Sequence, residues 1–180
     1  MLQIKLPASE YFDDNKQEFI QIREQTLNLE HSLVSISKWE SKWKKPFFEA
    51  VQKTPEEMLD YFRCMTINKD VDPNAYYTLT GPQVEKILKY IEEPQTATTI
   101  SNRNNVKKSK EIVTSELIYY WMVALQIPFE AQKWPLSRLL TLIEVCNIKN
   151  APPKKMSRRE IYERNKALNT ARRSRMHSKG

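Results

Sequence analysis

Ser32-Leu-Val-Ser-Ile-Ser-Lys-Trp-Glu-Ser-Lys-Trp43 is the stretch of the chain at which the apolar pattern becomes helical. Leu33, Ile36, Trp39 and Trp43 follow one another at spacings of three, three and four residues, so they share one helix face. Both Trp side chains are therefore expected to face a core, with the neighbouring lysines at its rim. The alternative, in which this basic and aromatic segment stacks bases and holds phosphates, is disfavoured by the helical spacing.

Further helices follow towards the C-terminus, and each has its own start signal. Thr54-Pro-Glu-Glu57 and Thr80-Gly-Pro-Gln83 predict capping boxes, in which the fourth side chain reaches back to the cap residue. Another amphipathic helix follows Pro135, and residues 111–126 are apolar on more than one side. We expect residues 111–126 to form the most buried helix.

The first thirty residues have the alternation of β-strands instead. Leu2, Ile4 and Leu6 alternate with polar residues, and a second alternating run covers residues 19–29. Asp13-Asp-Asn15 has turn chemistry, so a hairpin is predicted, and a phase slip near Glu24 suggests a β-bulge. Residues 95–110 are polar and are expected to form a loop, with a short strand at 97–100 that joins the hairpin.

Charge is concentrated at the C-terminal end. Residues 151–180 hold ten Lys or Arg and two Glu, a net charge of +8, whereas residues 1–150 hold 19 basic and 20 acidic groups. Ala151-Pro-Pro153 predicts a hinge, and Ser157-Arg-Arg-Glu160 predicts that the basic segment begins as a capped helix. The predicted protein is mainly α (α+β): a compact body of about five helices with a small N-terminal β-hairpin (1–150), then a hinged basic C-terminal helix or tail (151–180).

Composition argues against several classes of function. Gly81 and Gly180 are the only glycines, so phosphate-cradling loops and nucleophile elbows cannot be built. Cys64 and Cys146 are isolated in apolar stretches, which favours a reducing cytosol over a disulfide framework. Because the most apolar stretch is too short for a bilayer and the N-terminus lacks a signal peptide, no membrane association is expected.

Chemically active constellations are also not evident in the sequence. His31 and His177 are the only histidines, and a polar surface or capping role is expected for them rather than catalysis. Asp70-Val-Asp-Pro-Asn74 lacks the following Gly and distal Glu of a calcium loop, so a turn with Asx hydrogen bonds is expected. We predict no catalytic, metal-binding or cofactor-binding residues, and no enzyme.

The basic tail is the candidate binding element. Its apolar stripe is thin, so a helix here is marginal alone and is expected to dock on its own body, on a second copy or on another molecule. Arginines outnumber lysines, which favours bidentate recognition of phosphate or carboxylate, yet nucleic acid and an acidic protein face both remain open. The predicted partner-binding residues are Lys154, Lys155, Arg158, Arg159, Arg164, Arg172, Arg173 and Arg175.

Three strings resemble small proteins of tailed bacteriophages that are encoded near the tail-tube and tape-measure genes. They are His31-Ser-Leu-Val-Ser-Ile-Ser-Lys-Trp-Glu-Ser-Lys-Trp43, Thr54-Pro-Glu-Glu-Met-Leu-Asp-Tyr-Phe62 and Leu168-Asn-Thr-Ala-Arg-Arg173. The resemblance implies a tail assembly chaperone or a related tail-morphogenesis factor. Such a protein binds the coiled-coil-forming tape-measure protein and keeps it soluble until the tail tube polymerises around it.

The resemblance brings no catalytic residues and implies the host cytoplasm as the place of action. One alternative is a structural virion component, at the head–tail junction or baseplate, whose basic arm docks neighbouring subunits. A second alternative is a nucleic-acid-binding protein that uses the same tail.

Overall fold

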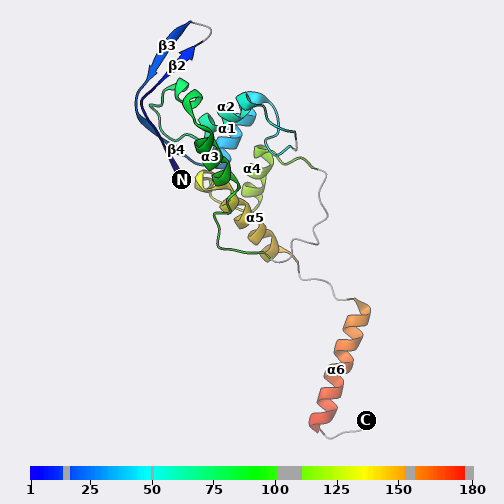
Figure 1. Cartoon of the computed structure of the whole chain (residues 1–180). Helices are drawn as coiled ribbons and strands as arrows, with labels where there is room; N and C mark the ends of the chain where they lie inside the picture. Colours follow the sequence, from blue (N-terminus) through cyan, green and yellow to red (C-terminus); the bar gives the residue numbers. More distant parts are fainter. Residues whose placement is uncertain (14–16, 50, 101–110, 153–156, 177–180) are drawn as a thin grey trace. The chain divides into compact units, whose positions relative to one another are not determined.

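The structure, a computed structural model, describes residues 1–13, 17–49, 51–100, 111–152 and 157–176. An N-terminal antiparallel hairpin precedes a series of helices, so the predicted α+β fold is confirmed (Figure 1). The chain divides into two compact units, Met1–Cys146 and Asn147–Gly180. The elements are β1 (Leu2–Leu6), β2 (Ser9–Asp13), β3 (Glu18–Ile22), β4 (Gln25–Leu29), α1 (Leu33–Trp43), α2 (Pro55–Met65), the 3-10 helix η1 (Pro73–Thr78), α3 (Gly81–Glu92), α4 (Ser115–Ala124), the 3-10 helix η3 (Phe129–Lys133), α5 (Leu136–Asn150) and α6 (Arg158–Met176).

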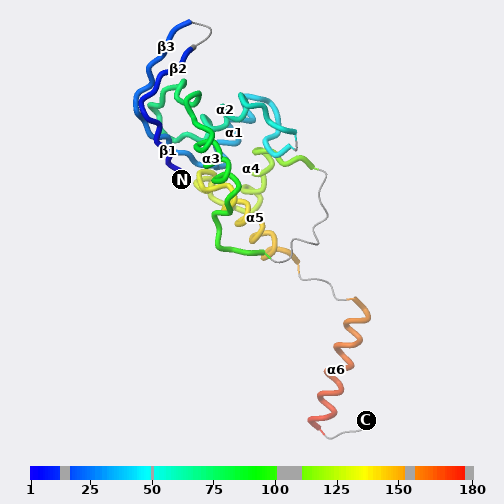
Figure 2. The backbone as a smooth tube through the Cα atoms, viewed as in Figure 1, coloured from blue at the N-terminus to red at the C-terminus, as the bar shows by residue number. Residues whose placement is uncertain are grey.

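The hairpin is a long one that is interrupted once. β1 pairs with β4 and β2 pairs with β3, and Figure 2 shows β2 and β3 continuing away from the helices. Leu6 lies opposite Gln25 and Ser9 lies opposite Ile22, so the register passes unchanged across the interruption. The bulge predicted at Glu24 is therefore wrong: Pro7, which has no N–H to donate, lies at the break between β1 and β2. Residues 14 and 15 of the predicted turn lie outside the described residues.

The ladder of β1 and β4 is hydrogen-bonded to other segments along both of its outer edges. Beside β4, the N–H of Ile67 donates to the carbonyl of Asn28 at 2.9 Å, and beside β1 the Gln83 side-chain amide donates to the carbonyl of Lys5 at 3.0 Å. The strand predicted at residues 97–100 is wrong, since this segment belongs to no ladder. Instead the N–H of Thr98 donates to the hydroxyl of Thr96 at 3.2 Å, a local bond of the kind that competes with strand pairing.

The first two long helices form as their sequences predict. Thr54 and Glu57 make the predicted capping box at the start of α2, with hydrogen bonds of 3.2 and 2.8 Å. Trp39 is buried, and its indole N–H donates to the carbonyl of Glu57 at 2.8 Å. The half-buried Trp43 donates to the Asp60 carboxylate at 2.9 Å. The two Trp side chains therefore join α1 to α2, which supports the structural interpretation over base stacking.

Two short polar signals are also confirmed. Asp72 accepts a hydrogen bond from the N–H of Asn74 at 2.8 Å, which is the predicted Asx turn and which begins η1. Gln83 accepts from the N–H of Thr80 at 2.9 Å at the start of α3. Cys64 and Cys146 are both free thiols.

The prediction that residues 111–126 form the most buried helix is wrong. The helix that forms, α4, has only Ser115, Ile118 and Met122 buried among its residues. It packs beside α1, so one side reaches the core while the opposite side remains exposed. Apolar residues on the other sides of α4 are therefore left uncovered by the described part of the chain.

Candidate macromolecular interface

α6 is the longest helix of the described chain and buries none of its 19 residues. Its start is well defined, because Ser157 and Glu160 form the predicted capping box: the N–H of Ser157 donates to the Glu160 carboxylate at 2.7 Å, and the N–H of Glu160 donates to the Ser157 hydroxyl at 3.2 Å. Such local bonds favour the helix but do not replace tertiary packing.

The predicted arginines lie along α6 with a short apolar stripe between them. Ile161 and Leu168 are seven residues apart and so share one face, and both are exposed. Arg172 and Arg175 follow Leu168 by four and seven residues, which extends the same face with positive charge. α6 carries six Arg and one Lys against two Glu, a net charge of +5. Lys154 and Lys155 lie outside the described residues.

Glu163, the second acid of α6 beside the capping Glu160, forms an ion pair within the helix. The Arg159 guanidinium lies 3.2 Å from the Glu163 carboxylate, an exposed pair at the i, i+4 spacing. Exposed pairs of this kind contribute only about 0.3 to 0.5 kcal/mol. The pair supports the helix locally and leaves a cationic surface along the rest of α6.

A second exposed surface, which sequence reasoning missed, lies on α4 and η3. The α4–η3 face comprises Tyr120, Val123 and Phe129, which are 65%, 60% and 55% exposed. The Phe129 ring lies 6.4 Å from the ring of Tyr119, whose hydroxyl donates to Gln132 at 2.9 Å. Exposed apolar residues mark an interaction site when they form a contiguous patch, and Tyr120 and Val123 lie one turn apart on α4. The apolar pattern on more than one side of residues 111–126 is the sequence signal for this surface, since apolar residues there exceed what one buried side needs.

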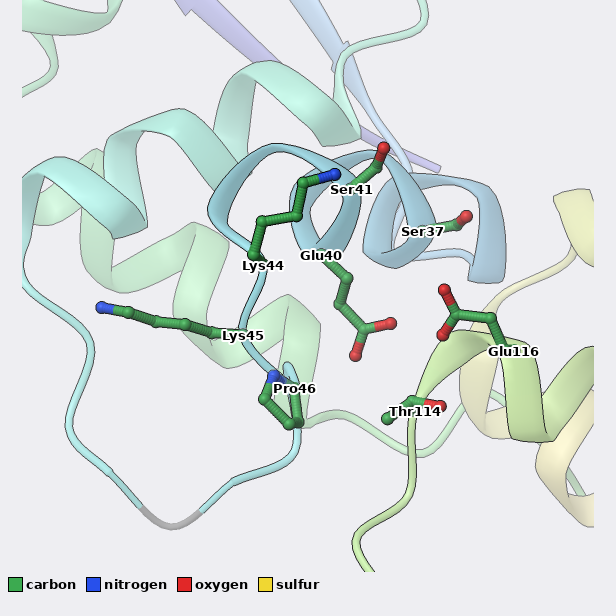
Figure 3. Close-up of a pocket in the computed structure, with 8 residues that line it drawn as sticks. All are labelled: Ser37, Glu40, Ser41, Lys44, Lys45, Pro46, Thr114 and Glu116. Atoms are coloured by element: carbon green, nitrogen blue, oxygen red, sulfur yellow. The ribbon is translucent and has the colours of Figure 1, made fainter.

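The start of α4 is fixed by a buried carboxylate from α1. Glu40 accepts the N–H of Phe47 at 2.7 Å with one oxygen and the N–H of Ser115 at 2.8 Å with the other. Figure 3 shows this side chain directed into the hollow between α1 and α4, with the exposed Glu116 on its far wall. Since both Glu40 oxygens are occupied by backbone donors, the carboxylate positions α4 and the surface that α4 carries. The hollow is lined by Ser37, Glu40, Ser41, Lys44, Lys45, Pro46, Thr114 and Glu116.

His31 does not occupy the polar surface or cap position predicted for it. The side chain is buried, and its Nδ1 lies 2.5 Å from the Tyr61 hydroxyl, which itself lies 3.3 Å from the hydroxyl of Ser35. Ser32, not His31, caps α1. Burial lowers the pKa of His31 to about 4, so the ring is neutral at neutral pH. His177 lies outside the described residues.

The Cys64 thiol is another titratable group of this region whose pKa is strongly shifted. Burial raises the pKa of the Cys64 thiol to about 11, and the nearby Asp60 carboxylate adds to this shift. Within the described ranges, no three His, Cys, Asp or Glu side chains are grouped so that they could hold a metal ion. The surfaces that stand out are therefore the α4–η3 face and the basic face of α6.

No helix in the described part of the chain has the length and apolar character needed to cross a membrane. Comparisons with protein-family models, with curated proteins and with solved structures find no match to this chain.

Proposed function

We propose that this chain is a phage tail assembly protein that acts by stoichiometric binding, as a chaperone for the tape-measure protein. The observation that carries the proposal is α6, a 19-residue helix with no buried residue. An isolated helix of this length is only marginally stable in water, and most helical stability in proteins comes from packing an apolar face. A partner that covers Ile161 and Leu168 would supply that packing.

The chemistry of α6 suits a helical client that carries carboxylates. Coiled-coil-forming helices place apolar residues in a seam and charged residues, often Glu, on its flanks. The arginine fork binds carboxylates with two parallel hydrogen bonds, and Arg172 and Arg175 extend the apolar face of α6. A client helix could therefore meet both the apolar stripe and the arginines of α6.

The α4–η3 face offers the client a second contact that is purely apolar. Tyr120 and Phe129 supply large aromatic surfaces, and burying each of them on a client would contribute roughly 1.5 to 3 kcal/mol by area alone. Aromatic anchors of this kind dominate the energetics of many interfaces. We place the action of the protein in the host cytoplasm, before tail assembly is complete.

Co-expression with the tape-measure protein of the same phage tests the proposal. We expect the soluble fraction of the client to rise when this chain is present and to fall at least tenfold with Arg172→Glu/Arg175→Glu, because the reversed charges repel client carboxylates. Lys86→Glu/Lys89→Glu makes the same change of net charge on exposed residues of α3 and should behave as wild type. Equal client solubility with and without this chain would refute the chaperone role.

The α4–η3 face is tested separately by Val123→Ser. We expect a tenfold weaker complex with the client at nearly unchanged stability, because Val123 is 60% exposed and little packing is lost on the chain itself. Affinity is measured by isothermal titration, and stability by urea unfolding. Val123→Ser binding at wild-type affinity would exclude this face from the client contact.

The structural-virion alternative and the nucleic-acid alternative rest on the same basic helix. Mass spectrometry of purified particles distinguishes a structural virion component from a chaperone, since a chaperone is expected to be absent from finished virions. Titration with duplex and single-stranded DNA at about 50 mM salt tests the nucleic-acid-binding function, because phosphate contacts are strongest at low ionic strength. Tight DNA binding there, with no effect on client solubility, would favour the nucleic-acid function.

A further inference from the structure

The outer part of the hairpin presents a pair of phenylalanines to solvent. Phe12 on β2 and Phe19 on β3 lie directly opposite each other, with ring centroids 5.0 Å apart. They are 38% and 69% exposed. Figure 1 shows that β2 and β3 form the part of the hairpin that continues beyond the helices. We name the side of the ladder that carries Glu10, Phe12, Phe19 and Gln21 the aromatic hairpin face.

The opposite side of the same ladder explains why the hairpin is ordered there. Tyr11 stacks on Tyr77 of η1, with ring centroids 5.0 Å apart and an interplanar angle of 15°. Ile22 is buried, and Ile20 lies opposite Tyr11 in the register. Since successive side chains alternate between the two sides of a strand, Phe12 and Phe19 point away from this anchored side. The packing of the hairpin onto the body therefore does not account for them.

The hairpin is also acidic. Residues 9–22 carry Glu10, Asp13, Asp14 and Glu18 against Lys16, a net charge of −3. Glu10 is exposed and lies two residues from Phe12, on the same side of β2. Glu18 alternates with Phe19 and so belongs to the Tyr11 side, which leaves Glu10 as the acid on the aromatic hairpin face, within a hairpin that is acidic as a whole.

We propose that the aromatic hairpin face is the docking site for α6 of a second copy of this chain. α6 has the complementary character: a net charge of +5 and an exposed stripe of Ile161 and Leu168. Aliphatic side chains on the phenylalanine rings would bury apolar surface on both partners, and arginine over a phenylalanine face adds a cation–π attraction. Exchange of α6 between two copies makes two such contacts, related by a two-fold axis, and a client that binds the same stripe of α6 would replace them.

Two other surfaces of a second copy, its α6 and its α4–η3 face, fit α6 less well. Pairing α6 with α6 would bring two helices of +5 together, which is repulsive at moderate salt. The α4–η3 face is bordered on η3 by both Glu130 and Lys133, so it offers no consistent charge to the arginines. The hairpin is the acidic and apolar surface that matches α6 in both respects.

Sedimentation equilibrium of the full chain, with no client present, is the first measurement. We expect a monomer–dimer equilibrium in the micromolar range at about 50 mM salt that weakens at least tenfold at about 1 M salt, where charges are screened beyond about 3 Å. Phe19→Thr replaces the ring by another residue that favours strands, so β3 should persist while the dimer weakens at least tenfold. A chain that stays monomeric up to about 100 μM at low salt, or a Phe19→Thr dimer of wild-type strength, would overturn the proposal.

Mixing two charge-reversed variants identifies the contact. Arg172→Glu/Arg175→Glu and Glu10→Lys/Gln21→Lys, the second of which changes two exposed residues of the aromatic hairpin face, should each be monomeric alone, because each brings like charges together. An equimolar mixture should dimerise, since both exchanged contacts then pair opposite charges. The control is Lys86→Glu/Lys89→Glu, which makes the same change of net charge as Arg172→Glu/Arg175→Glu but on α3. This control variant should dimerise alone. Absence of a dimer in the mixture would overturn the proposal and leave the chaperone function untouched, because no client takes part.

Discussion

Replacing Glu40 with alanine is expected to lower the free energy of unfolding by about 3 to 5 kcal/mol. The buried carboxylate accepts two backbone N–H groups, from Phe47 at 2.7 Å and from Ser115 at 2.8 Å. Alanine leaves both donors without this acceptor, and a buried donor that loses its partner costs about 1 to 3 kcal/mol. Because Ser115 lies 75 residues from Glu40, the loss also releases the start of α4 from α1.

Urea unfolding followed by circular dichroism measures this effect. Glu40→Gln keeps one amide oxygen as an acceptor, so it should retain about half of the stabilisation. Glu116→Gln is the matched control, since Glu116 lines the same hollow but is exposed, and it should change stability by no more than about 0.5 kcal/mol. Equal stabilities for Glu40→Ala and Glu116→Gln would contradict the role assigned to Glu40.

Features that depend on neighbouring residues were predictable from sequence. The capping boxes at Thr54 and Ser157 and the Asx turn at Asp72 each involve residues two or three positions apart. Their hydrogen bonds form within one turn of chain, so the pattern contains the whole interaction. The helical spacing of Trp39 and Trp43 likewise predicted that they share one inward face, but not that α2 supplies their hydrogen-bond partners.

Features that depend on distant residues were not predictable in this way. Periodicity reports which side chains are apolar, but not which of them another element covers, so the exposure of Tyr120 and Val123 could not be read from residues 111–126. The position of His31 before a helix predicts a polar surface or capping role, whereas Tyr61, thirty residues away, provides its buried partner. The partner-binding role of the α6 arginines remains a prediction, because their exposure is compatible with several partners.

The aromatic hairpin face also combines a local feature that the sequence predicts with a distant contact that it does not. Alternation in the first thirty residues predicted the hairpin, yet it did not indicate which side of the outer ladder would be anchored. The stacking of Tyr11 on Tyr77 decides this, because it places Phe12 and Phe19 on the opposite side. A contact between β2 and η1, sixty-six positions apart, thus determines which aromatic residues meet solvent.

The buried histidine should make the body sensitive to mild acid. The pKa of His31 is 6.5 in the unfolded chain and about 4 in the folded chain, because burial disfavours the charged ring. The folded state therefore binds the proton more weakly than the unfolded state. The stabilisation is complete above about pH 6.5 and is lost as the pH falls from about 6.5 towards about 4, at about 1.4 kcal/mol per pH unit.

Urea unfolding between pH 7 and pH 5 measures this dependence above the range in which carboxylates titrate. We expect the free energy of unfolding to fall by about 2 kcal/mol between pH 6.5 and pH 5, with a midpoint that shifts accordingly. His177→Gln removes the only other histidine and should retain the full dependence. His31→Gln should be less stable at pH 7, because it disrupts the contact with Tyr61, but its stability should change little over the same interval. A His31→Gln profile as steep as that of His177→Gln would mean that another group controls the acid sensitivity, since protonation of the buried imidazole is the step that the substitution removes.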